Sequence, residues 1–486
     1  MSKPDQFRIH LSLVSHTNIG KTTLARTLLM KDVGEVADRA HVTENTEDYV
    51  LARDAAGCEL VLWDTPGFGN SVALAKRLTG RTNPIGWFLA EVWDRMTNKA
   101  FWLNQRAIKH VKDISDVVLY LVNASDLPKT APYITAEMEI ISWINKPVIV
   151  LLNQMGKPRT HAEERADVEA WRDAMKPYPF VKDVLPMDAF ARCWVQETAL
   201  FDAIGRALPA TQHATFDALR DIWIRSRRAL YLSSVDAIAR HMWKLLQAHE
   251  LVPVPSLKDH VRSLANQIGL IKTRNVEMED AQTALSSMAA DSLCALTDKL
   301  IGINGLTGSG VSREILRRMK TDWQMASHTI APASAAAVGA GVGVAGGAAA
   351  GAAADAASAG LSLGLGTLLG GIIGAIGGVG AATIYNARHK KEGIDLSWSE
   401  HAARNFMLEA TLLYLAVAHF GRGRGDWQAG ESPEFWKIAV QDAMKELKIT
   451  FLPIRKLTPE AGVEQLTRLT DSLLRAVFMR LYERGI

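Results

Sequence analysis

A loop near the start of the chain carries residue types that bind phosphate chains. Residues 15–23 read Ser-His-Thr-Asn-Ile-Gly-Lys-Thr-Thr and follow the apolar stretch 9–14. This is the pattern G-x-x-x-x-G-K-[ST], with Ser15 in place of the first Gly. Backbone N–H groups of such a loop surround phosphates, and the following helix points its positive dipole end at them. We therefore expect Lys21 to reach the β- and γ-phosphates and the Thr22 hydroxyl to bind Mg²⁺.

The Ser at the first position is the one deviation within this loop. Ser is less favourable than Gly wherever the backbone needs a positive φ, so Ser15 is expected to be strained if that position needs one. The residues expected to contact the nucleotide are Ser15, Asn18, Ile19, Gly20, Lys21, Thr22 and Thr23.

A second motif lies downstream, where the apolar stretch 60–63 runs into Asp64-Thr65-Pro66-Gly67. A carboxylate at the end of a strand can hold Mg²⁺ through water, so Asp64 is a candidate metal residue. The N–H of Gly67 can meet a γ-phosphate.

Between the two motifs, the polar loop 41–46 offers a Thr that completes the Mg²⁺ shell once the γ-phosphate is present. Thr43 has the better spacing and Thr46 is the alternative; a merely solvated loop is the other interpretation.

The base-binding residues are expected after the fourth apolar strand, which ends in Asn153-Gln154-Met155-Gly156. Guanine-binding proteins carry N-K-x-D at this place. Asn153 would support the base, with Gln154 beside it, but Gly156 stands where the acid should accept from the base. Losing that acceptor costs about 1–3 kcal/mol of discrimination. Asp188 is the candidate replacement for this acid.

In this order the three motifs resemble those of the translation-factor-related GTPases, and the loop resembles G-x-x-N-x-G-K-[ST] of their Era/TrmE-like branch. The resemblance covers residues 7 to about 200 and departs from the pattern at Ser15 and Gly156. It implies a doubly wound sheet of five or six strands, GTP or GDP as ligand, and Mg²⁺. The remainder resembles bacterial GTPases that carry a C-terminal domain of unknown function.

Two residues refine the mechanism that this resemblance implies. Asn18 matches the loop Asn that binds K⁺ in potassium-activated members, where the ion neutralises transition-state charge; alternatively, it only stabilises the loop. Phe68 follows Gly67 and cannot orient an attacking water. We expect slow intrinsic hydrolysis that rises with K⁺ or with self-association into a homodimer or higher oligomer. Catalytic roles are assigned to Lys21, Thr43 and Gly67.

The elements that must position these residues form an α/β pattern. Apolar strands are predicted at 9–14, 59–63, 117–122, 148–152 and 181–185, alternating with helical stretches. Such alternation favours a doubly wound, mostly parallel sheet. An all-α C-terminal half follows, with long helices at 219–251 and 281–301 and a helix starting at Thr458-Pro459. The predicted domains are 1–205, 206–329, 330–387 and 388–486.

Residues 330–387 are rich in Gly, Ala and aliphatic residues, and their glycines recur at every fourth position. This spacing places the glycines on one helical face, where two backbones can approach closely. We predict a glycine-zipper hairpin with Asp355 near its tip and both ends on the cytoplasmic side. Insertion into the inner membrane, burial in protein and a Gly/Ala linker are the three alternatives. The spaced residues are Gly339, Gly343, Gly347 and Gly351, then Gly366, Gly370, Gly374 and Gly378.

Composition adds weak constraints. The net charge of +3 does not indicate nucleic-acid binding, and no RNA-binding module is recognised after residue 200. Three widely spaced Cys and a polar N-terminus favour a cytosolic protein without a signal peptide. The sequence predicts a GTPase switch on the cytoplasmic face of the membrane. A membrane-remodelling or scaffold GTPase and a nucleotide-binding module with little turnover are the alternatives.

Overall fold

The computed structural model describes residues 7–30, 47–69, 71–79, 99–126, 128, 133–153, 161–187, 194–253, 276–306, 385–390, 393–420 and 433–482. The chain divides into two compact units. The first unit is residues 1–230 with 418–425 and 481–486, and the second is residues 231–417 with 426–480.

A six-stranded sheet forms the centre of the first unit. Its spatial order is β2 (Glu47–Arg53), β3 (Glu59–Asp64), β1 (Arg8–Ser15), β4 (Val117–Asn123), β5 (Val148–Asn153) and β6 (Val181–Pro186). All neighbouring pairs are parallel except β2 with β3. The five predicted strands are confirmed to within one residue at each end. The edge strand β2 was not predicted, because its apolar run 49–52 is short, charged residues flank it, and most of its residues are exposed.

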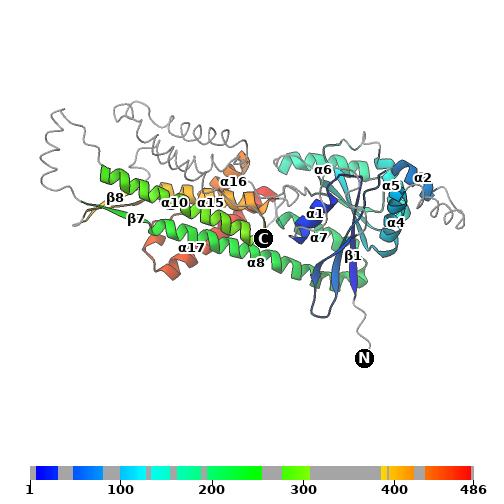
Figure 1. The fold of residues 1–486 in the computed structure, drawn as a ribbon, viewed down its shortest axis with the longest axis horizontal. Helices are drawn as coiled ribbons and strands as arrows, with labels where there is room; N and C mark the ends of the chain where they lie inside the picture. Colours follow the sequence, from blue (N-terminus) through cyan, green and yellow to red (C-terminus); the bar gives the residue numbers. More distant parts are fainter. Residues whose placement is uncertain are drawn as a thin grey trace. The chain divides into compact units, whose positions relative to one another are not determined.

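Helices cover both faces of this sheet, which explains why its strands β4 and β5 are apolar up to their last residue. On one face lie α1 (Lys21–Leu29) and α7 (Trp194–Ala207), which pack on side chains such as Leu11 and Leu62. The other face is covered by α2 (Ser71–Thr79), α4 (Lys99–Ile114), α5 (Ile134–Ile144) and α6 (His161–Met175). Figure 1 shows α1 and α7 on the opposite side of β1 from α4 and α5.

The long helix α8 (Ala210–Gln247) runs across the division between the two units. Its first half adds Phe216, Leu219 and Trp223 to the core of the first unit. The first compact unit therefore extends to residue 230, beyond the predicted boundary at 205.

The second unit is mainly helical, as the sequence predicts. It contains the rest of α8 with α10 (Val276–Ile303), α15 (Glu400–Ala418), α16 (Glu434–Glu446) and α17 (Pro459–Tyr482), and the short 3-10 helix η2 (Ile454–Lys456). Tyr231 of α8 packs against Tyr414 of α15 and Phe478 of α17. Helix α17 begins at Pro459, directly after Thr458, where the sequence predicts it.

A three-stranded antiparallel sheet in the second unit was not predicted. Its order is β7 (His249–Pro253), β9 (Gly393–Trp398) and β8 (Tyr385–Lys390). The helix predicted to reach residue 251 ends at Gln247, and β7 follows it. Strand β8 takes up residues 385–387, the last of the predicted hairpin, and the basic residues that follow.

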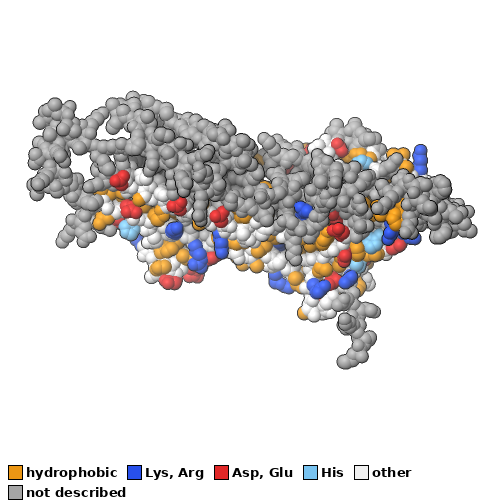
Figure 2. Space-filling model, in the orientation of Figure 1, with side chains coloured by type: hydrophobic (Ala, Val, Ile, Leu, Met, Phe, Trp, Pro, Cys, Tyr) orange, Lys and Arg blue, Asp and Glu red, His pale blue; other side chains and the backbone are white. Residues whose placement is uncertain are grey.

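The rest of the glycine-rich hairpin lies outside the described residues. Among the helices that the structure describes, none combines the length and apolar character that crossing a bilayer requires. On the face drawn in Figure 2, acidic and basic side chains are mixed over the described residues, as expected from the small net charge.

Candidate functional site

The loop between β1 and α1 has the backbone of a phosphate-binding loop. Strand β1 ends at Ser15 and helix α1 begins at Lys21. Left-handed φ angles occur within the loop at Asn18 (61°) and Gly20 (94°), whereas Ser15 stays in the extended strand. The expected strain at Ser15 is therefore absent, because its position needs no positive φ. Asn is one of the few residues with a side chain that tolerates the conformation of Asn18.

Two strand ends hold this loop from the side. The Asn153 Nδ2 group at the end of β5 donates a hydrogen bond to the Ile19 carbonyl. Gly20 has a φ of 94°, which favours Gly, and a Cβ there would also lie 2.7 Å from Asn153 Nδ2. From the segment after β3, the Phe68 N–H donates to the Ser15 carbonyl at 3.0 Å. These contacts hold the backbone of the loop.

The N-terminus of α1 suits an anion. Its N-cap residue, Gly20, has no capping side chain and its first turn contains no acidic residue, so the start of the helix offers partial positive charge. Lys21 Nζ donates to Ser15 Oγ at 3.0 Å. Burial lowers the pKa of the Lys21 ammonium, and the carboxylates of Asp64 and Glu137 oppose that shift. A buried cation beside an uncapped helix start is an arrangement that a phosphate chain would stabilise.

Thr22 and Asp64 form the part of the site that fits a metal ion. Thr22 Oγ1 donates to Asp64 Oδ2 at 2.5 Å, and both residues are buried. Asp64 Oδ1 is buried and has no hydrogen-bond partner among the described residues. Burial raises the pKa of Asp64, while Lys21 and Thr22 oppose the shift. Hydroxyl and carboxylate oxygens are the ligands that Mg²⁺ prefers, so the residues present fit this ion.

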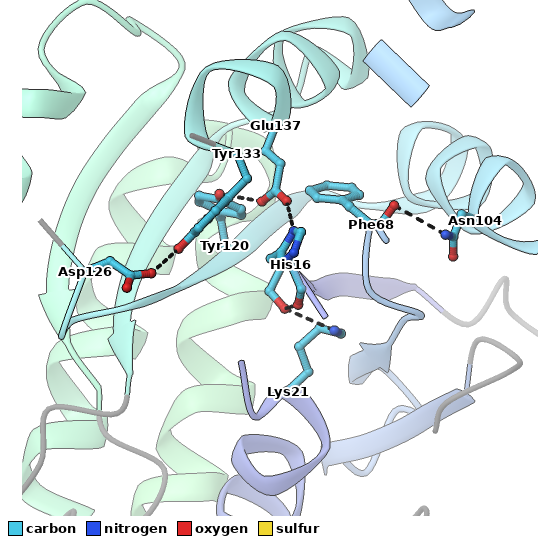
Figure 3. A network of polar contacts seen from close by, with 9 residues as sticks. His16, Lys21, Phe68, Asn104, Tyr120, Asp126, Tyr133 and Glu137 are labelled. Carbon is cyan, nitrogen blue, oxygen red and sulfur yellow. Dashed lines mark hydrogen bonds and ion pairs between the residues drawn. The ribbon is translucent and has the colours of Figure 1, made fainter. Parts of the chain in front are cut away.

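A polar network that the sequence analysis missed extends from the loop into the core (Figure 3). His16 Nδ1 lies 2.7 Å from Glu137 Oε1, and the Tyr120 hydroxyl donates to Glu137 Oε2 at 2.7 Å. The His16 ring stacks on Tyr133 with centroids 4.8 Å apart, and the Tyr133 hydroxyl donates to Asp126 at 2.8 Å.

A signal for this network was present in the sequence. Glu137 falls on the same helical stripe as the apolar residues Ile134, Met138 and Ile141, all buried in α5. A carboxylate on an apolar stripe needs a buried partner.

The structure brings together most of the predicted site and leaves part of it outside the described residues. Ser15, Lys21, Thr22, Asp64, Gly67 and Asn153 surround the start of α1, and Thr23 is buried in its first turn. Thr43 and its alternative Thr46, Gln154, Gly156 and Asp188 lie outside the described residues. The position of Asn18 gives it a role in shaping the loop backbone.

Two family models match this chain. Residues 10–154 match the family described as 50S ribosome-binding GTPase. Residues 320–467 match a domain of unknown function (DUF3482), which spans part of the glycine-rich segment and most of the C-terminal helices. No curated protein matches the sequence.

Solved structures of GTPases are similar to part of this chain. An Aquifex aeolicus Era variant bound to GDP and AlF₄⁻ is 19% identical over 42% of this chain and 57% of its own, with a TM-score of 0.30. Era with MgGDPNP and a segment of 16S ribosomal RNA is 18% identical over 42% and 58%, with a TM-score of 0.30. A probable GTP-binding protein, EngB, is 16% identical over 40% of this chain and 99% of its own, with a TM-score of 0.26.

This chain therefore spans less than two thirds of the length of the two Era chains. Its N-terminal part is a P-loop GTPase domain, followed by a mainly helical C-terminal half.

Proposed function

We propose that this protein binds GTP in its N-terminal domain and hydrolyses the γ-phosphate with water in the presence of Mg²⁺. One observation carries the proposal. At the uncapped start of α1, a buried ammonium and a buried hydroxyl–carboxylate pair lie side by side, and each would be stabilised by an ion that MgGTP supplies.

The residues of the site would have different roles in binding and hydrolysis. Lys21 and the loop N–H groups bind the phosphates, and Thr22 and Asp64 hold the metal ion. The backbone N–H of Gly67 meets the γ-phosphate, and Thr43 senses it. Bound Mg²⁺ supplies positive charge to the β- and γ-phosphate oxygens. Asn153 keeps the loop in place beneath the nucleotide.

The direct test is phosphate release by the purified protein from GTP, ATP and XTP over a range of Mg²⁺ concentrations. We expect hydrolysis of GTP to need Mg²⁺ and to exceed that of ATP and XTP. Asp64→Asn should raise the Mg²⁺ concentration for half-maximal rate about tenfold. The control Asp113→Asn changes an exposed carboxylate of α4 and should leave it unchanged. Equal turnover with EDTA would contradict the proposal, and a preference for XTP would replace GTP as the substrate.

We also propose that the nucleotide state acts as a switch read by the C-terminal half. The continuous helix α8 belongs to both compact units, which supports this role. The proposed K⁺ dependence rests on Asn18 alone. Hydrolysis rates in K⁺ and Na⁺ at several protein concentrations test it. Equal rates in both salts would remove K⁺ stimulation, and a rate per protein molecule that is the same at every concentration would remove activation by self-association.

Association with the cytoplasmic face of a membrane is proposed for the glycine-rich segment from residue 330. Sedimentation with anionic lipid vesicles, with GDP or a non-hydrolysable GTP analogue, tests it. The comparison is a chain without residues 330–384, which keeps strand β8 intact. We expect the full chain to sediment and the shortened chain to stay in solution; equal sedimentation of both would contradict the membrane role.

A further inference from the structure

Ser15 is the residue at which the phosphate-binding loop departs from the pattern G-x-x-x-x-G-K-[ST]. Its backbone stays extended at the end of β1, so the backbone conformation does not require a glycine there. The Ser15 side chain has no exposed surface. Because a buried hydroxyl is costly without hydrogen-bond partners, its partners indicate what the serine does.

The Ser15 hydroxyl makes two hydrogen bonds, and chemistry decides the direction of each. It donates to the backbone carbonyl of His16 at 2.5 Å. An ammonium group has no acceptor, so Lys21 Nζ donates to Ser15 Oγ, at 3.0 Å. The hydroxyl therefore offers its lone pair to the lysine, which a glycine side chain could not do.

Lys21 is a buried cation whose side chain crosses the phosphate-binding loop. It starts at the first residue of α1, and its ammonium meets Ser15, the last residue of β1. Figure 3 shows the Lys21 side chain reaching towards the loop at His16. Among the residues that the structure describes, no other group accepts a hydrogen bond from this ammonium. An ammonium carries three hydrogens, so two remain for phosphate oxygens.

The other contacts of the two residues do not fix the direction of the ammonium. The carboxylates of Asp64 and Glu137 attract the charge of Lys21, but a charge interaction has no fixed direction. The Ser15 carbonyl accepts from the Phe68 N–H at 3.0 Å. That bond belongs to the backbone, so a substitution of the Ser15 side chain leaves its atoms in place.

We propose that Ser15 is a positioning residue that holds the Lys21 ammonium over the phosphate-binding loop, where the phosphates of GTP bind. This inference rests on the proposed binding of GTP. A lysine that is already held in place loses less conformational freedom when the phosphates arrive, which favours binding. Restoring the glycine of the pattern should therefore weaken GTP binding rather than improve it.

The first test is the affinity of the full chain for a fluorescent GTP analogue with Mg²⁺. Ser15→Ala and Ser15→Gly both remove the hydroxyl, and each should weaken binding about fivefold. Ser12→Ala is the matched control, because Ser12 is buried in the same strand and its Oγ lies 2.5 Å from Ser115 Oγ. This control should bind like the parent.

A double-mutant cycle separates positioning of Lys21 from simple support of the loop. If Ser15 acts through Lys21, adding Ser15→Ala to Lys21→Ala should change the affinity less than about twofold. If the hydroxyl only supports the loop through the His16 carbonyl, Ser15→Ala weakens binding equally with and without Lys21, and the inference is overturned.

Two further outcomes would also decide against this role of Ser15. Unchanged or tighter binding by Ser15→Ala or Ser15→Gly, in a parent chain that binds the analogue, overturns the inference and leaves the proposed function intact. A parent chain that does not bind the analogue refutes the proposed GTP binding itself, and the role of Ser15 with it.

Discussion

Among single residues, Gly67 lies very close to the backbone of Thr17. A Cβ at position 67 would lie 2.9 Å from Thr17 Cα and 3.0 Å from its backbone nitrogen. Because neither is the end of a flexible side chain, we predict that Gly67→Ala displaces the phosphate-binding loop. GTP affinity should fall about tenfold, or about 1.4 kcal/mol, in a fluorescence titration.

Gly302 provides a matched control. It lies in the last turn of α10, and a Cβ there would meet nothing within 4 Å. Gly302→Ala should keep the GTP affinity and stabilise the helix by about 0.5 kcal/mol. Equal GTP affinities of both variants and the parent would show that the contact with Thr17 does not determine the position of the phosphate-binding loop.

The residues of the loop could be predicted because their spacing in the chain is short and their chemistry is specific. Lys21, Thr22 and Asp64 meet as expected, since β1 and β3 are neighbours in the sheet. The bond between His16 and Glu137 joins residues 121 positions apart and could not be predicted from local spacing. Likewise, a sequence pattern does not show the φ of a residue, so the absence of backbone strain at Ser15 could not be predicted.

At the level of elements, the C-terminus of α1 is fixed by a buried residue of α8. Arg227 donates to the carbonyl of Leu28 at 2.5 Å and lies 3.5 Å from Glu197 of α7. Its guanidinium also lies over the Trp223 ring at 4.6 Å. We predict that Arg227→Met destabilises the first unit by about 3 kcal/mol in urea titrations, because it leaves a buried carboxylate without its cation.

The double variant isolates that cause. Arg227→Met combined with Glu197→Gln removes both charges and should be more stable than Arg227→Met alone. If the two variants unfold at the same urea concentration, the carboxylate is not what the arginine stabilises.

A pH-sensitive contact joins α8 and α10. His241 Nδ1 lies 2.9 Å from Ser292 Oγ, and burial lowers the pKa of His241 from 6.5 to about 4. The unfolded chain therefore binds a proton more readily than the folded chain as pH falls from 6.5 towards 4, and stability is lost over that window. At about pH 5 the loss is about 2 kcal/mol relative to about pH 7.5.

We predict that His241→Gln removes this loss. Between about pH 7.5 and about pH 5, the melting temperature of the second unit should fall by roughly 4–8 °C more in the parent than in the variant. The same pH dependence in both proteins would show that His241 is not the titrating group.

The elements differ in how well the sequence predicts them. Strands such as β4 and β5 are buried on both faces and appear as continuous apolar runs, so they were found. Strand β2 at the sheet edge has only the short apolar run 49–52 between charged residues, and β8 is polar, with the residues Arg-His-Lys at its end. They form because β3 and β9 offer hydrogen-bonding partners, which local sequence does not reveal.

For the whole molecule, the extent of the first unit gives a further prediction. A chain of residues 1–205 lacks Phe216, Leu219 and Trp223, which are buried in the core of the first unit. At about 2 kcal/mol each, their loss amounts to roughly 6 kcal/mol, which is comparable to the net stability of a domain. We expect residues 1–205 to aggregate and residues 1–230 to stay soluble and bind GTP, as judged by size-exclusion chromatography. Equal solubility of both would place the boundary at 205.

The sequence predicts more about the N-terminal half of the chain than about the C-terminal half. The N-terminal motifs predict both a fold and a ligand, and the family match covers residues 10–154. In the C-terminal half, amphipathic helices predict only that a helical core exists. How Tyr231, Tyr414 and Phe478 combine depends on contacts between distant segments.

We propose that the triphosphate of GTP binds at the start of α1, where Lys21 is buried. Titration of a fluorescent GTP analogue with Mg²⁺ against the full chain, Lys21→Ala and Lys109→Ala tests it most directly. Lys109 is an exposed cation of α4 and serves as the control. We predict that Lys21→Ala weakens binding about 10- to 100-fold while Lys109→Ala binds like the parent. Parent-like binding by Lys21→Ala would contradict the account.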